Sequence, residues 1–136
     1  MSPLKYFLDV DYGEWSGKGI EEIRENWPRE FAVWVDDPEK AVFPGGERLS
    51  GVRERLREGL ERLARDHDGT VLLVGHKLIN RIVICIVLGL PTSGIWKVEQ
   101  SNAAINLISR GERGWVLERL NDTSHLRGIE SIDQQT

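Results

Sequence analysis

A run of apolar residues that ends in glycine and histidine constrains the fold of this chain more than any other feature. Residues 71–74 are valine and leucine only, a composition typical of a strand buried on both faces. Gly75 and His76 follow directly. Residues 78–88 are apolar on nearly all sides, with Gly89 as the expected C-cap. A strand, a tight turn and a helix in this order predict an α/β fold.

Other segments supply the remaining elements of a predicted α/β sandwich. The apolar residues of 47–66 recur every three or four positions, which predicts one long amphipathic helix whose outer charges form a solvated face. Residues 103–108 and 115–120, joined by a glycine-containing turn, predict an antiparallel hairpin. Shorter elements are also expected, namely a strand or extended segment and two helices bounded by proline, at residues 4–10, 20–26 and 29–35.

Length and composition restrict the class of protein. The chain has 136 residues, of which 40% are hydrophobic and 29% charged, enough for one globular domain with its own core. Its net charge of −4 and its isoelectric point near 5.4 argue against a nucleic-acid partner, because phosphate backbones favour a clustered basic face. The tryptophans are therefore interpreted as packing residues rather than a base-stacking platform.

No segment predicts a membrane-bound or secreted protein. Residues 1–11 carry interspersed charges and do not resemble a signal peptide. The longest apolar run is roughly a dozen residues, whereas a helix that spans a bilayer needs about 20. The single cysteine, Cys85, lies inside an apolar run and is expected to be a buried small side chain. We therefore expect a cytoplasmic protein with no disulfide and no membrane partner.

His76 is the strongest candidate for a functional side chain. The predicted strand delivers it to a carboxyl end, where open α/β sheets bind ligands. The first amides of the following helix have no partners within the helix, and the helix dipole adds positive charge there. His76 with Lys77 beside it has the chemistry to hold a phosphoryl oxygen. The alternative is a histidine that merely caps the helix or binds a neighbouring loop, and spacing alone leaves both interpretations open.

The other polar candidates are less specific. Asp9, Asp11 and Glu14 cluster near a glycine turn and include a possible general acid, but nothing in the residues themselves distinguishes the three. His67 stands between two aspartates at a helix end, where an imidazolium suits the dipole and needs no function. His125 lies in a polar tail and is expected in a surface loop or a C-terminal clasp.

Taken together, the motifs of this chain resemble the histidine phosphatase superfamily, the phosphoglycerate mutase-like proteins. The pieces that carry the resemblance occur in the family's order: residues 8–17 with Gly-Glu-Trp-Ser-Gly, residues 43–47 (Phe-Pro-Gly-Gly-Glu), residues 74–77 with Arg81, and residues 100–106 with 121–126. The resemblance implies a three-layer sandwich, a mostly parallel sheet flanked by helices with a C-terminal antiparallel hairpin. It also implies phosphoryl transfer through a covalent phosphohistidine on small phosphomonoesters, with no metal or other cofactor.

The resemblance assigns roles to four residues. Asp9 matches the general acid that protonates the leaving oxygen, and His76 matches the second histidine of the phosphate pocket. Gly75 would keep the strand end tight, and the backbone amide of Lys77 would assist in phosphate binding. The family usually has glycine at the position of Lys77, so this departure weakens any inference about the substrate beyond a small phosphorylated metabolite.

The resemblance also identifies an absence. The family opens with a strand that ends in Arg-His-Gly, whose histidine is the nucleophile, and no Arg-His pair occurs in this sequence. We therefore expect residues 1–136 to be a single partial domain, the C-terminal portion, that is inactive or nearly so alone. Without the first strand, sheet edges and apolar surface would be uncovered. The expected remedy is self-association, strand exchange or a complementing N-terminal fragment.

Two other functions compete with a phosphatase. One is a non-catalytic module that keeps an anion pocket at His76 and binds a phosphorylated ligand or a partner chain. The other is an unrelated α/β domain in which the Gly75–His76 turn is only structural. Saturable phosphate binding without turnover would favour the module, and a His76→Ala variant with unchanged anion binding would favour the unrelated domain.

Overall fold

The computed structural model describes residues 4–129. Its α-helices and strands are α1 (Ile20–Asn26), α2 (Pro28–Asp36), α3 (Leu49–Asp66), α4 (Lys77–Leu88), β1 (Ile105–Gly111) and β2 (Gly114–Asp122). Short 3-10 helices occupy Lys5–Phe7, Gly13–Trp15, Pro38–Lys40, Thr92–Lys97 and Ser124–Leu126. Over these residues, no helix is both long enough and apolar enough to cross a membrane.

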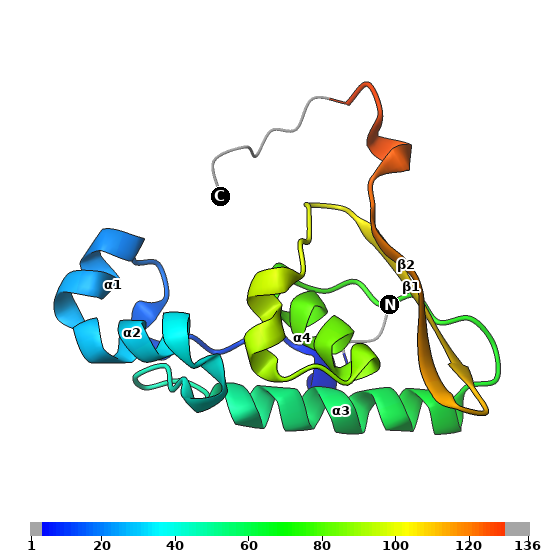
Figure 1. Cartoon of the computed structure of the whole chain (residues 1–136), viewed down its shortest axis with the longest axis horizontal. Helices are drawn as coiled ribbons and strands as arrows, with labels where there is room; N and C mark the ends of the chain where they lie inside the picture. Colours follow the sequence, from blue (N-terminus) through cyan, green and yellow to red (C-terminus); the bar gives the residue numbers. More distant parts are fainter. Residues whose placement is uncertain (1–3, 130–136) are drawn as a thin grey trace.

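The long helix α3 runs along one side of the molecule, and the other elements are distributed along it (Figure 1). α1 and α2 lie beyond its N-terminal end, α4 packs beside its middle, and the β1–β2 hairpin stands at its C-terminal end (Figure 1). The core lies between α3 and α4, where Val52, Leu56, Ile79 and Ile82 are almost fully buried. The predicted apolar face of the long helix is therefore confirmed.

A cluster of aromatic side chains around Phe43 forms another part of the core. Phe43 is fully buried, and the rings of Tyr12, Trp15 and Trp34 lie 5.0, 5.2 and 5.4 Å from its ring, centroid to centroid. Trp96 packs edge-on against Trp34 at 4.8 Å. These tryptophans are packing residues, as predicted, and aromatic pairs of this geometry contribute beyond their buried area.

The hairpin is tied to α3 through one carboxylate. Glu61 of α3 accepts a hydrogen bond from the Arg110 guanidinium at 2.7 Å and one from the Trp115 indole at 3.4 Å. The same guanidinium lies over the Trp115 ring, 5.0 Å from its centroid. Trp115 therefore anchors the hairpin end of the molecule, away from the aromatic cluster.

Two loops cross in close contact at Gly13 and Gly46. A side chain at Gly13 would collide with the backbone of Pro44, and one at Gly46 would collide with the backbone of Asp11. Gly13 also has φ +56°, in the left-handed region that favours glycine. The Glu47 amide donates to the Asp11 carbonyl oxygen at 2.9 Å across the crossing. The loops at residues 8–17 and 43–47 are therefore locked together.

The helices follow their sequence signals closely. α1 has the predicted bounds, and α2 is the predicted 29–35 helix extended by one residue at each end, with Pro28 as its first residue. α4 ends at Gly89, which has φ 67° and the left-handed conformation of a C-cap. The C-terminal antiparallel hairpin is confirmed, with the turn between Gly111 and Gly114. Together these elements confirm the α/β class.

The predicted parallel sheet is not formed by the described residues. Residues 71–74 make no strand pairing, and Leu72 and Val74 are 86% and 76% exposed, so the prediction of a strand buried on both faces is wrong here. A strand needs a neighbour to satisfy its backbone, and within residues 4–129 the sheet contains only β1 and β2. Residues 4–10 were predicted as a strand or an extended segment. They form no strand, Lys5–Phe7 are a 3-10 helix, and residues 8–10 have no regular secondary structure.

Candidate functional site

The structure brings His76 and Asp9 together at the N-terminus of α4. His76 is the N-cap residue, with extended backbone and a carbonyl oxygen that accepts from the Asn80 amide at 2.9 Å. Its imidazole makes no capping hydrogen bond and is 60% exposed. Its Nδ1 lies 3.6 Å from Oδ2 of Asp9. An imidazole and a carboxylate therefore meet where the unpaired amides of α4 are available to an anion.

Arg55 of α3 holds the segment that carries Asp9. Its guanidinium donates to the carbonyl oxygens of Tyr6 at 2.8 Å and Asp9 at 3.2 Å. The Asp9 carboxylate accepts from the Val10 amide through Oδ1, at 2.8 Å, which leaves Oδ2 toward His76. The position of Asp9 thus depends on a helix that is distant in sequence.

Glu47 connects the same arginine to the crossed loops. Its carboxylate accepts from Arg55 at 3.0 and 3.1 Å and from the Asp11 amide at 2.9 Å. Partial burial acts to raise the pKa of Glu47, but the hydrogen bonds from Arg55 and Asp11 and the charge of Arg55 outweigh it and hold the pKa below its ordinary value of 4.5. α3 begins at Leu49 rather than at the predicted position 47, because the backbone amide and carbonyl of Glu47 are paired with Asp11 and Phe43 in the crossed loops.

Replacing Glu47 by glutamine should remove a pH-dependent part of the stability. A carboxylate with a lowered folded-state pKa contributes stability above its unfolded value, and this contribution is lost as pH falls through the folded-state pKa. We expect Glu47→Gln to lower the unfolding free energy by about 1–2 kcal/mol at pH 7, and the difference from wild type to shrink as pH falls below 4.5. Urea unfolding from pH 7 to pH 3 measures it, with the exposed Glu112→Gln as control. A difference independent of pH would contradict this role.

Tyr12 is a member of the site that the sequence analysis did not single out. Burial and then the negative charge of Asp9 raise the pKa of Tyr12 to about 12. Its ring packs on Phe43 in the aromatic cluster. The charge of Asp9 therefore reaches the Tyr12 hydroxyl, which is held in the aromatic cluster. Its place three positions after Asp9, in the motif of residues 8–17, was the available signal.

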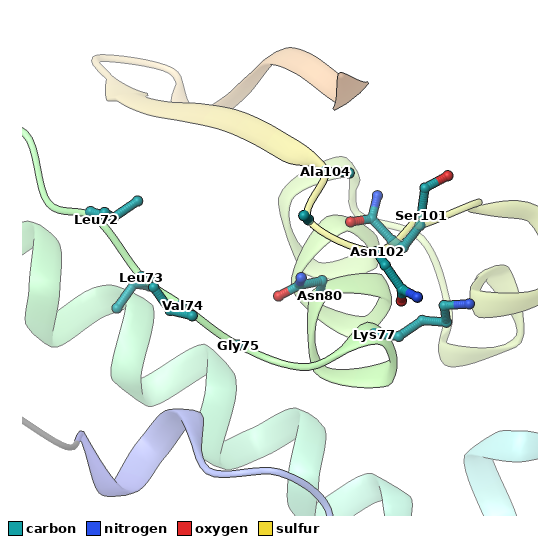
Figure 2. A pocket seen from close by; sticks show the side chains of 11 residues that line it. Leu72, Leu73, Val74, Gly75, Lys77, Asn80, Ser101, Asn102 and Ala104 are labelled. Atoms are coloured by element: carbon teal, nitrogen blue, oxygen red, sulfur yellow. The ribbon is translucent and has the colours of Figure 1, made fainter. Parts of the chain in front are cut away.

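Gly75 and Lys77 border a cavity of about 290 Å³ beside the His76 turn. Residues 72–75 form one side of it and residues 100–104 the other (Figure 2). Asn80, Ser101 and Asn102 add amide and hydroxyl groups, which were not predicted. His76 is not part of the lining, so the cavity lies next to the His76–Asp9 pair without including it.

Side-chain amides join the segment at 100–106 to the end of β2. Gln100, which is buried, and Asn106, which is half-buried, exchange hydrogen bonds at 3.0 and 2.7 Å. Asn121 donates its amide to Asn106 and accepts from the Ser101 amide. His125 lies 2.9 Å from the Ala103 carbonyl oxygen. Of the two predictions for this histidine, a surface loop or a C-terminal clasp, the last interaction favours the clasp.

The remaining candidates have structural roles. His67 is the C-cap residue of α3, at the helix end where it was predicted. Cys85 is fully buried in the core, as expected for a small apolar side chain. In the part of the chain that the structure describes, no group of three or more histidine, cysteine or acidic side chains is placed to hold a metal ion.

Comparison with known proteins identifies relatives named as phosphatases and phosphoglycerate mutases. At the sequence level, phosphoserine phosphatase 1 of Hydrogenobacter thermophilus is 38% identical over 120 residues, which are 88% of this chain and 57% of that protein. A probable phosphoglycerate mutase GpmB of Erwinia tasmaniensis is 28% identical over 75% of this chain and 49% of its own length. Both are longer than the region they share with this chain.

Solved structures agree on the fold. YhfR of Bacillus stearothermophilus superposes with a TM-score of 0.83 at 23% identity, over 90% of this chain and 62% of that one. The alpha-ribazole phosphatase of Shigella flexneri has a TM-score of 0.75 at 18% identity, over 88% and 59%. The chain thus spans roughly half to three fifths of these relatives. The family model of the histidine phosphatase superfamily (branch 1) matches residues 2–123, and the chain therefore belongs to that superfamily.

Proposed function

We propose that the N-terminus of α4 is the phosphate site of a phosphatase that acts on small phosphomonoesters. The observation that carries the proposal is the approach of the His76 imidazole to the Asp9 carboxylate, 3.6 Å apart, beside the free amides of α4. An imidazolium and helix amides are suited to hold phosphoryl oxygens. Superfamily membership and the phosphatases among the relatives support this reaction class.

Each residue has a defined task in the proposed reaction. His76 binds an oxygen of the phosphoryl group and stabilises the charge that develops on it. Asp9, in its protonated form, gives its proton to the leaving oxygen as the phosphorus–oxygen bond breaks. Gly75 keeps the turn narrow, and the Lys77 amide assists. To complete the reaction in the manner of the superfamily, a nucleophilic histidine would have to accept the phosphoryl group as the leaving oxygen departs, and water would then release phosphate from it.

None of the histidines in this chain is assigned the role of nucleophile. The sequence contains three; His67 caps the far end of α3, and His125 is bound to Ala103. His76 would have to act as both nucleophile and electrostatic clamp. We therefore propose that the 136-residue chain binds phosphate but turns phosphomonoesters over slowly or not at all. A cytoplasmic location, with a small phosphorylated metabolite as substrate, is part of the same proposal.

Phosphate binding by the purified chain tests the site. We expect inorganic phosphate to bind weakly and saturably in isothermal titration, and His76→Ala to weaken it about ten- to one-hundred-fold through loss of a charge-assisted hydrogen bond. His67→Ala serves as the matched control, because His67 lies at the end of α3 and makes no contact with the proposed site, and it should bind phosphate like wild type. Equal phosphate affinity in wild type and His76→Ala would contradict the assignment.

A non-catalytic anion-binding module is the second candidate. The superfamily mechanism uses two histidines, one as nucleophile and one to bind phosphate. The presence of His76 alone beside Asp9 favours a module that binds without catalysis. Turnover separates the two functions. Release of phosphate from phosphoserine or an aryl phosphate, lost in Asp9→Asn and His76→Ala alike, would establish the phosphatase. Binding that depends on His76 without any turnover would establish the module for this chain.

A further inference from the structure

The chain makes a tight turn at residues 101–104, which lies across the 290 Å³ cavity from residues 72–75 (Figure 2). The Ala104 amide donates to the Ser101 carbonyl oxygen at 3.3 Å and closes the turn. Residues 101–103 are exposed. The turn therefore forms a wall of the cavity without being packed into the core.

Ala103 has an unfavourable backbone conformation in this turn. Its φ is +56°, whereas Asn102 before it does not have a positive φ. A turn with positive φ at its third residue alone favours glycine at that position. The Cβ of an alanine is crowded in the left-handed region, so such a residue persists only where the surrounding contacts fix it. Other segments must therefore hold the turn in place.

The two ends of the turn are held by amide side chains. Asn121, at the end of β2, accepts a hydrogen bond from the Ser101 amide at 2.7 Å. Asn121 itself has φ +52°, which asparagine tolerates better than alanine does. Gln100 and Asn106 join the segments on either side of the turn. These contacts fix where the turn begins and ends, but they do not bind Ala103.

His125 contacts the strained residue itself. Its Nε2 lies 2.9 Å from the Ala103 carbonyl oxygen, and because a carbonyl oxygen only accepts, the imidazole is the donor. His125 belongs to the 3-10 helix Ser124–Leu126. The Ser124 amide donates to the Asp122 carboxylate at 2.9 Å, which fixes the start of that helix after β2. A short helix thus delivers a donor to the centre of a turn that is distant in sequence.

We propose that His125 is a positioning residue, whose hydrogen bond to Ala103 holds the turn at 101–104, and with it the cavity wall beside His76, in the strained form. Without this bond, Ala103 relaxes toward an extended conformation, and the polar groups that the turn presents to the cavity move with it. The bond is exposed, so it opens without unfolding of the core. The segment after β2 therefore acts as a latch on the cavity wall.

Two substitutions separate the hydrogen bond from the bulk of the ring. Phenylalanine keeps a planar ring at position 125 but has no donor, whereas glutamine has no ring but carries an N–H donor at a similar distance from the backbone. A His125 that only covers the surface would be replaced by phenylalanine without effect on the turn. A latch would be lost with phenylalanine and kept with glutamine.

Hydrogen exchange of the full chain, followed by NMR, tests the latch. In His125→Phe, the protected amides of Ser101 and Ala104 should exchange about three- to ten-fold faster, as expected for loss of one exposed hydrogen bond. His125→Gln should exchange within about two-fold of wild type. His67→Phe makes the same change at the end of α3 and should leave these amides unaffected.

Ala103→Gly tests whether strain is the reason for the latch. Glycine adopts a positive φ without the Cβ penalty, so the turn should no longer depend on His125. In the double variant Ala103→Gly/His125→Phe, the Ala104 amide should exchange about five-fold or more slowly than in His125→Phe alone. A double variant that exchanges as fast as His125→Phe would contradict the role of strain.

Signals from the opposite side of the cavity report whether the latch controls the cavity. Gly75, Lys77 and Asn80 line it across from the turn. Their amide chemical shifts should change in His125→Phe and return to the wild-type values in His125→Gln. Unchanged shifts in His125→Phe would show that the turn does not set the shape of the cavity, and would overturn the inference.

Three further results would overturn the inference. They are equal exchange of the turn amides in His125→Phe and wild type, glutamine acting no better than phenylalanine, and acceleration that extends equally to the amides of α3. The last result would mean a loss of overall stability rather than release of the turn. The inference goes beyond the proposed function, because the latch requires Ala103 and His125 and not phosphate binding at His76.

Discussion

Replacing Gly13 by alanine is expected to lower the free energy of unfolding by about 3 kcal/mol. A left-handed conformation costs an alanine about 1–2 kcal/mol, and overpacking against a fixed neighbour adds about 1–3 kcal/mol. Both penalties apply here, since Gly13 has φ +56° and its new Cβ would meet the backbone of Pro44 and Gly46. Backbone atoms in the crossed loops have no rotamer to move into, so the strain has to be relieved by separating the loops.

Gly17 provides a matched control for this substitution. It also has positive φ, +74°, but a Cβ there would meet no atom within 4 Å. We expect Gly17→Ala to cost only the conformational term, about 1 kcal/mol. Urea unfolding at 25 °C, followed by tryptophan fluorescence, compares the two variants. Equal losses would mean that the crossing of the loops is not a close contact.

Replacing Arg55 by methionine is expected to have the second large effect, about 2–3 kcal/mol. Methionine keeps an apolar stem but removes the donors to Glu47, Tyr6 and Asp9. The Glu47 carboxylate would then lose its charged partner. The segment that carries Asp9 would be released from α3, so hydrogen exchange at residues 6–10 should become faster under conditions where the variant remains folded.

Controls separate this positioning role from a general effect of charge. Arg57→Met removes an arginine from the same helix, where it pairs with Glu54 in solvent, and should leave the stability close to that of wild type. Arg55→Lys should rescue little, because an ammonium group lacks the fork that reaches several acceptors. Unchanged hydrogen exchange at residues 6–10 in folded Arg55→Met would show that Arg55 does not position Asp9.

The helices could be predicted because their signals are local. The bounds of α1 follow from its apolar spacing and from Pro28, and the end of α4 follows from Gly89. Each signal acts within one or two turns of the residues that form it. Such elements do not depend on which other segments are present.

The sheet could not be predicted in the same way. The valine and leucine composition of residues 71–74 describes an environment buried on two faces, and only neighbouring strands create that environment. The described residues supply none beside this segment. The conformation of residues 4–10 also depends on a distant segment. Arg55 of α3 donates hydrogen bonds to the carbonyl oxygens of Tyr6 and Asp9, and these residues form a turn instead of a strand.

The candidate site was predicted in part. The turn at His76 was identified from its position after an apolar run, whereas Asp9 was separated from Asp11 only by the family resemblance and not by the residues themselves. In the structure, Asp9 faces His76, whereas Asp11 accepts from the Gly13 amide at 2.9 Å within its own turn. The role of Arg55 was not predicted. Along a helix rich in arginine and glutamate, the sequence does not distinguish a half-buried arginine that binds another segment from one that only faces solvent.

The distribution of the tryptophans also makes the two ends of the molecule optically distinct. Trp15, Trp34 and Trp96 report on the aromatic cluster, with Trp27 packed near them, whereas Trp115 reports on the hairpin. A Trp115→Phe variant therefore emits from one end only, and the difference from wild-type emission isolates the other. Fluorescence can thus follow the loosening of the loop crossing and the detachment of the hairpin as separate events in one unfolding experiment.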